Sequence, residues 1–404
     1  MLTEDNKQER IVFTEFSKKS LEQARDASRI KPASYLPRRL DLRGKTVITF
    51  SGCCSNVPEC ALSLYRTRSG WELGVHIADV SEYVCEGSPL DTDAKERRAT
   101  LNNQFIDVLM LPEAVTKDVC GLTVGQDKLA LSVLLDISPD GRLISTKFEE
   151  SVIRVAENCI YDEIDRAVFT KEISSIYALR QKYAPYKNIF LDLYELAAVF
   201  SNRRIEKGAL DCTVFYKSET HDAANNTITE YISEPDSRAM IREIGYFAAE
   251  AIGNFMFVNK LPCIYIGQET ISREDVEKIE DIIGICSNDD DLALRTSHVI
   301  NAAKGTDKYI DICNFIKSNL PCAQFSVEPI YNTHCASDKV VSFVRPATRY
   351  ADLLTQRMLK ICISAKGDVK NININRYRTV ANEAAEKANE AEMFVYNCIF
   401  NQCK

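Results

Sequence analysis

The sequence lacks long apolar runs, an excess of positive charge and closely spaced cysteine pairs. No stretch approaches the roughly 18 uninterrupted apolar residues of a membrane span, and the polar start, Met1 to Arg10, does not resemble a secretory signal. The 50 Lys and Arg against 58 Asp and Glu give a net charge of −8. Proteins that bind nucleic acid usually have a basic balance or a basic stripe, so composition alone argues against RNA binding, although a local cationic channel stays compatible with it.

The fifteen cysteines are scattered, and their number is odd. This pattern is typical of buried, reduced thiols, so we expect a cytoplasmic protein without membrane contact. Cys53, Cys54 and Cys60 lie near one another, but adjacent cysteines rarely share one metal ion, and no C-x-x-C motif or neighbouring histidine accompanies them. We therefore expect no zinc site there.

Strand-like segments precede helix-like segments along the chain. After an amphipathic helix at 14–30, strands are expected at 45–50, 61–65, 71–77, 129–137 and 143–153, with turn residues at Arg68–Gly70 and Pro139–Gly141. Helices are expected at 187–207, 237–258, 272–284, 346–362 and 376–400, interrupted by a strand pair at 211–217 and 227–232. This order predicts an α+β fold, with early hairpins of a mixed sheet packed against a largely helical second half.

Separated motifs then give a resemblance to a known family. They are Asp41-Leu-Arg-Gly44, Gly74-Val-His-Ile-Ala-Asp-Val-Ser81, Gly87-Ser-Pro-Leu-Asp91, Met110-Leu-Pro-Glu-Ala114, Lys207-Gly-Ala-Leu-Asp211 and Pro346–Leu353. In order and spacing they resemble the catalytic domain of the ribonuclease II (RNB) family. The resemblance divides the chain into an N-terminal helical extension at 1–35, an RNB-like domain at 36–364 and a C-terminal helix at 365–404. Neither flank is long enough for the five-stranded OB domains of full-length family members.

The resemblance implies hydrolysis of RNA from the 3′ end, with magnesium held by four aspartates of one loop. Those four positions hold Ser51, Val57, Glu59 and Cys60 here. Valine cannot bind a metal, a neutral serine binds weakly, and a thiolate is too soft for magnesium. We therefore expect no cofactor. Magnesium is expected only if nuclease activity remains, and Glu59 would then be its only ligand among these four positions.

Other family positions differ as well. The first arginine of the family's phosphate-binding pair is Thr348, and the second is Arg349. The two aromatic residues that stack on RNA bases align with Asn102 and Cys212, and a family histidine aligns with Gln268. Base stacking contributes roughly 1–3 kcal/mol per base, so both losses predict weak capture of a 3′ end.

Arg345 and Arg349 are expected to retain RNA contact. Their i,i+4 spacing would place them on one face of the helix expected at 346–362. For His76, Asp79 and Asp91, which lie in the family motifs, we expect structural roles, with His76 hydrogen-bonded in the core.

Three functions remain open at this point. The first is a catalytically inactive RNB-fold protein that acts by binding single-stranded RNA, weakly, or a protein partner. The second is a residual 3′–5′ exoribonuclease that uses magnesium and Glu59. The third is a scaffold or regulatory pseudoenzyme without an RNA role, which the acidic net charge favours.

Overall fold

A mixed six-stranded sheet forms the centre of the first half of the chain, in a computed structural model that describes residues 15–52, 58–102, 107–169, 177–212, 215–221, 227–233, 235–285, 289–365 and 374–400. Its strands are β1 (Leu40–Asp41), β2 (Val47–Ser51), β3 (Cys60–Thr67), β4 (Gly70–Ala78), β7 (Asp127–Ile137) and β8 (Leu143–Ile160), in the order β1-β8-β2-β3-β4-β7. β8 is long enough to pair with three strands, and β1 runs parallel to it at Ser151 and Val152. Its first part, up to Arg154, pairs antiparallel with β7, and the segment from Val155 to Ile160 runs parallel to β2. The pairing with β2 closes the sheet on itself.

Two tight turns fix the register of the hairpins. The β3–β4 hairpin pairs Thr67 with Gly70, whose φ of +134° and close approach to the Ile137 carbonyl leave no room for a side chain. The β7–β8 turn contains Gly141 at φ +76°, and the Ser138 amide donates to the Arg142 carbonyl at 2.9 Å. Both turns lie where the sequence predicted them.

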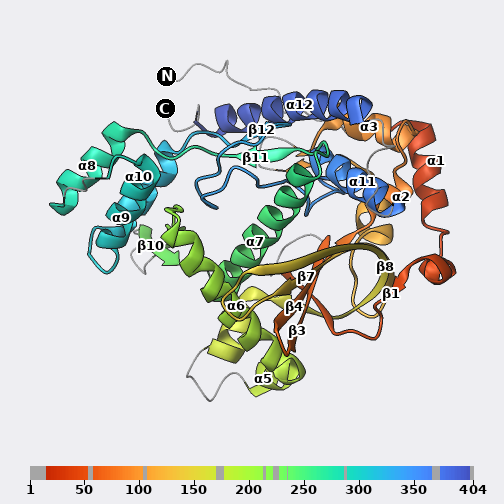
Figure 1. Cartoon of the computed structure of the whole chain (residues 1–404), viewed down its shortest axis with the longest axis horizontal. Helices are drawn as coiled ribbons and strands as arrows, with labels where there is room; N and C mark the ends of the chain where they lie inside the picture. Colours follow the sequence, from red (N-terminus) through yellow and green to blue (C-terminus); the bar gives the residue numbers. More distant parts are fainter. Residues whose placement is uncertain are drawn as a thin grey trace.

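Helices dominate the rest of the molecule (Figure 1). The α-helices are α1 (Lys18–Ala27), α2 (Val80–Tyr83), α3 (Pro89–Arg97), α4 (Tyr161–Ile164), α5 (Tyr177–Tyr183), α6 (Lys187–Glu206), α7 (Asp236–Val258), α8 (Arg273–Ile283), α9 (Leu292–Ala303), α10 (Tyr309–Asn319), α11 (Tyr350–Ser364) and α12 (Ile374–Phe400). Shorter helical segments are η1 (Pro32–Arg38), η2 (Ala114–Val119), η3 (Asp165–Phe169) and η4 (Ala184–Tyr186). Three two-stranded pairs complete the elements: β5 (Leu101–Asn102) with β6 (Asp107–Val108), β9 (Phe215–His221) with β10 (Thr227–Ser233), and β11 (Tyr265–Gly267) with β12 (Gln324–Ser326).

The α+β prediction is confirmed, although the helices differ in detail, and α2 to α5 were not expected from the sequence. The helix expected at 346–362 begins only at Tyr350, because residues 345–349 form a turn in which the Arg349 amide donates to the Arg345 carbonyl at 2.8 Å. Helices α9 and α10 were not expected. Within the described residues, no helix has both the length and the hydropathy that crossing a membrane requires.

Two large apolar clusters hold these layers together. One joins β3, β4 and β7 to α6 and α7, with Leu73, Leu135 and Ile252 fully buried. The other joins β2, α2, α3 and α11 to the C-terminal helix, where Ala381 and Ala385 are buried. The strand ends that carry the candidate residues therefore rest on a well-packed framework.

Candidate functional site

The end of β2 carries the first of the four positions assigned by resemblance. Ser51 is almost fully buried and lies beside β8, and its Oγ is 3.2 Å from Asn158 Oδ1 and 3.1 Å from Asn158 Nδ2. Thr49, two residues earlier on the same strand, donates to Asn158 Oδ1 at 3.0 Å. This is a neutral cluster of two hydroxyls and one amide, bonded to one another, and none of its members is a carboxylate.

Glu59 is the one carboxylate among the four positions, and its oxygens are bonded to the protein. Oε2 accepts a hydrogen bond from the Ala347 amide at 2.7 Å, and Oε1 accepts one from Thr348 Oγ1 at 2.9 Å. Burial raises the pKa of Glu59 to about 7, although these two bonds act in the opposite direction. Glu59 thus joins the start of β3 to the turn before α11.

The other two of the four positions, Cys60 and Val57, do not supply a charged oxygen that could bind a metal. Cys60 is the first residue of β3, and burial, together with the nearby Glu59, raises the pKa of its thiol to about 12. Its sulfur is therefore neutral near pH 7 and a poor metal ligand. Val57 lies outside the described residues, as do Cys53 and Cys54. Ser51, Glu59 and Cys60, as arranged here, do not fit a magnesium ion, which prefers several charged oxygen ligands.

Thr348 and Arg349 are held by neighbouring strands and side chains. The Thr348 carbonyl accepts from the Thr100 amide at 2.8 Å, in the segment before β5. Arg349 Nη1 donates to Ser342 Oγ at 3.0 Å, and its guanidinium lies 5.6 Å from the centre of the Phe325 ring. The second family arginine is therefore already engaged within the protein.

Arg345 differs from Arg349 in its exposure. The Arg345 side chain is exposed, while its backbone amide donates to Asp352 Oδ2 at 2.8 Å. Both arginines precede α11, and Arg349 is the N-cap with extended backbone. The expectation that their i,i+4 spacing places them on one helix face is wrong, because the 345–349 segment is a turn and not a helix.

The remaining family positions are only partly described. Asn102 is a residue of β5, and its side chain lies outside the description. Cys212 follows the 207–211 motif, and a hydrogen bond with the Cys313 thiol, together with burial, raises the pKa of its own thiol. Gln268 Nε2 donates to the Pro321 carbonyl at 2.7 Å, and its Oε1 is 3.1 Å from His334 Nε2. Sequence reasoning missed His334, since no motif links positions so far apart in the chain.

The structural role expected for His76 agrees with its surroundings. His76 is fully buried, with Nε2 3.0 Å from Ser63 Oγ and Nδ1 2.7 Å from Ser132 Oγ. Burial lowers the pKa of His76 to about 3, so the ring is neutral at physiological pH. Asp91 likewise accepts from the Tyr350 hydroxyl at 3.0 Å and pairs with Arg357 at 2.7 Å.

Three carboxylates that sequence reasoning did not group converge away from these positions. Asp79, Glu82 and Glu150 bring their oxygens close enough to share a metal ion. Arg39 Nη2 is already 2.8, 2.8 and 3.3 Å from them, and Lys360 Nζ is 3.0, 2.6 and 3.0 Å from them. Because two cations occupy the space between the carboxylates, the cluster is a buried ion network. Asp79 is fully buried and pairs with both cations, which is compatible with the structural role expected for it.

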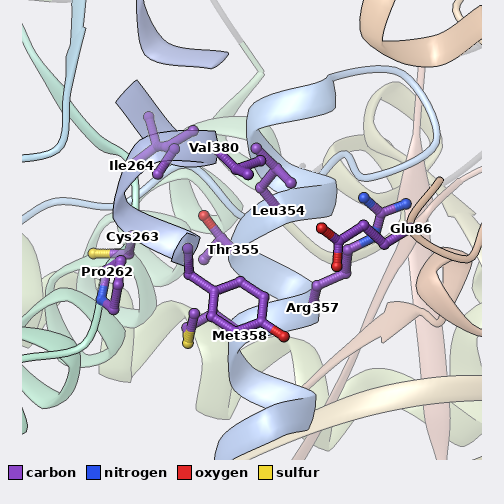
Figure 2. Close-up of a pocket in the computed structure, with 11 residues that line it drawn as sticks. Glu86, Pro262, Cys263, Ile264, Leu354, Thr355, Arg357, Met358 and Val380 are labelled. Atoms are coloured by element: carbon purple, nitrogen blue, oxygen red, sulfur yellow. The ribbon is translucent and has the colours of Figure 1, made fainter. Parts of the chain in front are cut away.

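A small cavity lies between α11, α12 and residues 262–264 (Figure 2). Its volume of about 20 Å³ suits one water molecule. Arg357 lines it and has two buried nitrogens, Nε and Nη1, without a partner. None of the residues that the sequence singled out lines this cavity.

Comparison with known proteins gives a match over most of the chain. A model of the RNB domain matches residues 39–365. Ribonuclease R 1 of Lactococcus lactis is 26% identical over 359 residues, covering 86% of this chain and 43% of that protein. Ribonuclease R of Thermotoga maritima is 26% identical over 384 residues, covering 90% and 53%. The chain thus spans about half the length of these curated relatives.

Solved structures share the fold. Mycoplasma genitalium RNase R in complex with ribose-methylated single-stranded RNA superposes with a TM-score of 0.80 at 20% identity, covering 97% of this chain and 61% of that one. Yeast Ssd1, described as a pseudonuclease, has a TM-score of 0.65 at 19% identity, covering 89% and 45%. At these identities the likeness establishes the fold alone.

Proposed function

Because the chain belongs to the RNB family, we propose that it binds single-stranded RNA without hydrolysing it. The observation that carries this proposal is the bonding of Glu59. The one carboxylate at the four positions assigned by resemblance is used to hold Ala347 and Thr348. Ser51, at another of the four positions, is part of a neutral cluster with Asn158.

The chemistry of metal-assisted hydrolysis supports the proposal. A divalent ion at the scissile phosphate activates the attacking water and stabilises the leaving oxygen, and it must be held by charged oxygen ligands. Glu59, with a pKa of about 7, is only partly ionised at neutral pH, and each of its oxygens already accepts a hydrogen bond. A magnesium ion held by this single carboxylate would be bound weakly, so the hydrolytic step of the family would lack its metal.

The binding half of the proposal rests on family and fold. Two structural neighbours are RNase R complexes with single-stranded and with double-stranded RNA. In this chain the exposed Arg345 lies beside the Glu59–Thr348 contact, where a phosphate could reach it. Binding there is expected to be weak, indifferent to a free 3′ end, and strongly salt-dependent. The scattered, odd-numbered cysteines favour the cytoplasm as the location of this activity.

End-labelled single-stranded RNA incubated with the protein and magnesium or manganese tests the catalytic half. The RNA should stay at full length while the protein retards it in a binding assay. Progressive 3′ shortening that disappears in Glu59→Ala would overturn the proposal in favour of a residual nuclease. A folded protein that neither shortens nor binds RNA at low salt would leave a scaffold role.

A further inference from the structure

The segment from Ser17 to Arg39 has a charge opposite to that of the whole chain. It contains seven Lys and Arg and only two Asp and Glu, a net charge of +5 in a chain whose net charge is −8, although Arg39, one of the seven, is buried and paired with Asp79. The segment comprises α1 and the following η1, and it lies at one outer edge of the molecule (Figure 1). A concentrated basic region in an acidic protein points to a specific anionic partner more than to general solubility.

The packing of α1 turns its basic side outward. Ser20, Ala24 and Ala27 are its buried residues, and the helix contacts α3 and η2 on that side. Residues at i, i+4 and i+7 share a helix face, so the opposite face carries Lys18 and Arg25, both exposed. The helix thus packs through small side chains and presents its long cationic ones to solvent.

The basic surface continues into η1 and gains an aromatic ring there. Lys31 and Arg38 are exposed, and Tyr35 is half-buried between them in the sequence. The guanidinium carbon of the exposed Arg38 lies 5.5 Å from the centre of the Tyr35 ring, whereas Arg39, at 5.4 Å from the same centre, is buried and paired with Asp79 and does not face a ligand. Cations beside an aromatic ring are the combination that binds phosphates and stacks bases in single-stranded nucleic acid.

The cations of this surface are available to a ligand. Among the described residues, Lys18, Arg25, Lys31 and Arg38 make no ion pair. The one pair on the surface joins Arg29 and Asp26 at 3.0 Å, and both side chains are more than two-thirds exposed. Such an exposed pair is worth little and would yield to a phosphate.

The geometry points to α1 and η1 as a phosphate-binding surface for single-stranded RNA, separate from Arg345; this inference rests on the proposed function. A basic amphipathic helix can also bind an anionic membrane, but it then inserts its apolar face between lipids. Here the face opposite the cations is made of small residues already packed inside the protein. The surface offers charges and one ring to a flexible polyanion, and its two exposed large apolar side chains, Leu21 and Ile30, are too few to form an apolar face for a bilayer.

The test compares two variants with equal loss of charge. The first changes Lys18, Arg25, Lys31 and Arg38 to Gln. The matched control changes the exposed Arg273, Lys278, Lys308 and Lys317 to Gln, in α8–α10 or just before α10, at the opposite end of the molecule (Figure 1). Affinity for an unstructured oligonucleotide is measured by fluorescence anisotropy from 50 to 300 mM salt, and melting curves confirm that both variants fold.

The first variant should lose at least tenfold in affinity at the lowest salt and reduce the log–log salt slope by up to about three units, at about 0.7 per phosphate contact. The control should stay within a factor of about two or three of the parent. Equal loss in both variants, or none in the first, would overturn the inference while leaving the proposed function intact. Stronger binding of the parent to phosphatidylserine vesicles than to RNA would overturn it in favour of a membrane. RNA shortening by the parent would remove the proposed function but not the surface, since slope and affinity can still be measured without divalent metal.

Discussion

The region around Asp79 and the region around Glu59 both contain buried carboxylates, but their surroundings have opposite effects on the ionisation of these groups. Around Asp79, three carboxylates surround Arg39 and Lys360, so every charge has a partner of opposite sign. Around Glu59, one carboxylate faces only neutral donors, and its pKa rises to about 7. A buried carboxylate stays charged where cations are fixed beside it, and otherwise it tends toward the neutral form.

The two regions also differ in what their polar groups contact. The Asp79 network ties η1, α2, β8 and α11 together, and its charges are consumed in that contact. The Glu59 region has the position that resemblance gives to a metal site, but its hydrogen bonds now join a strand to a turn. Both regions join separate elements of the fold, one through charge and the other through neutral hydrogen bonds.

The largest effect on stability is expected when the charge of Asp79 is removed from its ion network. Asp79→Asn keeps an oxygen that can cap α2, where Asp79 Oδ1 accepts from the Glu82 amide at 3.2 Å, but it removes the fully buried charge opposite Arg39 and Lys360. Leaving a buried charge without any partner costs about 3–5 kcal/mol, and Arg39 and Lys360 still keep Glu82 and Glu150 as partners. The free energy of unfolding from urea denaturation should therefore fall by about 3 kcal/mol, the lower end of that range.

Asp26→Asn is the matched control for this prediction. Asp26 also pairs with an arginine, Arg29, but both side chains are exposed to solvent. Its loss should change the free energy of unfolding by less than about 1 kcal/mol. Equal effects of the two variants would contradict the view that the Asp79 network is held by buried charge.

The framework of these regions could be predicted from local sequence, but their contacts could not. The turn at Pro139–Gly141 was predictable because Pro, Asp and Gly favour its backbone geometry. The start of α11 was misplaced because Pro346 is compatible with a first helical turn, whereas pairing of Ala99 with Arg349 fixes an extended backbone there. Pairings of this kind depend on segments far apart in the chain, which local periodicity does not encode.

The candidate site was predictable to a similar extent. The motifs led to Glu59 and Thr348 as separate positions, but not to the hydrogen bond between them, which spans 289 residues. The same holds for Arg39 and Lys360, which no motif connects to Asp79. Residue identity predicted which of the family's ligand positions lack a carboxylate, and only the three-dimensional arrangement gave the hydrogen bonds that Glu59 makes.

A smaller effect on stability is expected from the titration of Glu59. The pKa of Glu59 is raised from 4.5 to about 7 on folding, so the folded state binds its proton more tightly than the unfolded state. The contribution to stability is full below pH 4.5 and is lost as pH rises toward 7, by about 3 kcal/mol at most. Glu59→Gln should remove this dependence and leave the protein more stable than the parent at pH 8.

Urea denaturation of parent and variant between pH 4.5 and 8 measures this difference. Glu22→Gln, at an exposed position of α1, serves as the control for the change in formal charge. The difference between parent and Glu59→Gln should change steadily across the range, whereas the control should run parallel to the parent. A Glu59→Gln curve parallel to that of the parent would show that Glu59 is ionised in the folded state throughout.

The smallest effect on stability is expected when carboxylates are introduced at all four positions assigned by resemblance. Changing Ser51, Val57, Glu59 and Cys60 together to Asp would place four carboxylates where no described cation is within ion-pairing distance of Glu59. Without metal their mutual repulsion should lower stability, unlike the Asp79 network, which contains its own cations. Magnesium or manganese should then restore it, because an ion that binds only the folded state stabilises it by about 2.7 kcal/mol at a hundred times its Kd.

A variant with Asn at positions 51, 57 and 60 and Gln at 59 supplies similar side chains without charge, and its melting temperature should not respond to either ion. If the Asp variant folds but also fails to respond, the four positions do not surround a common point, and the correspondence with the family's aspartate loop is wrong.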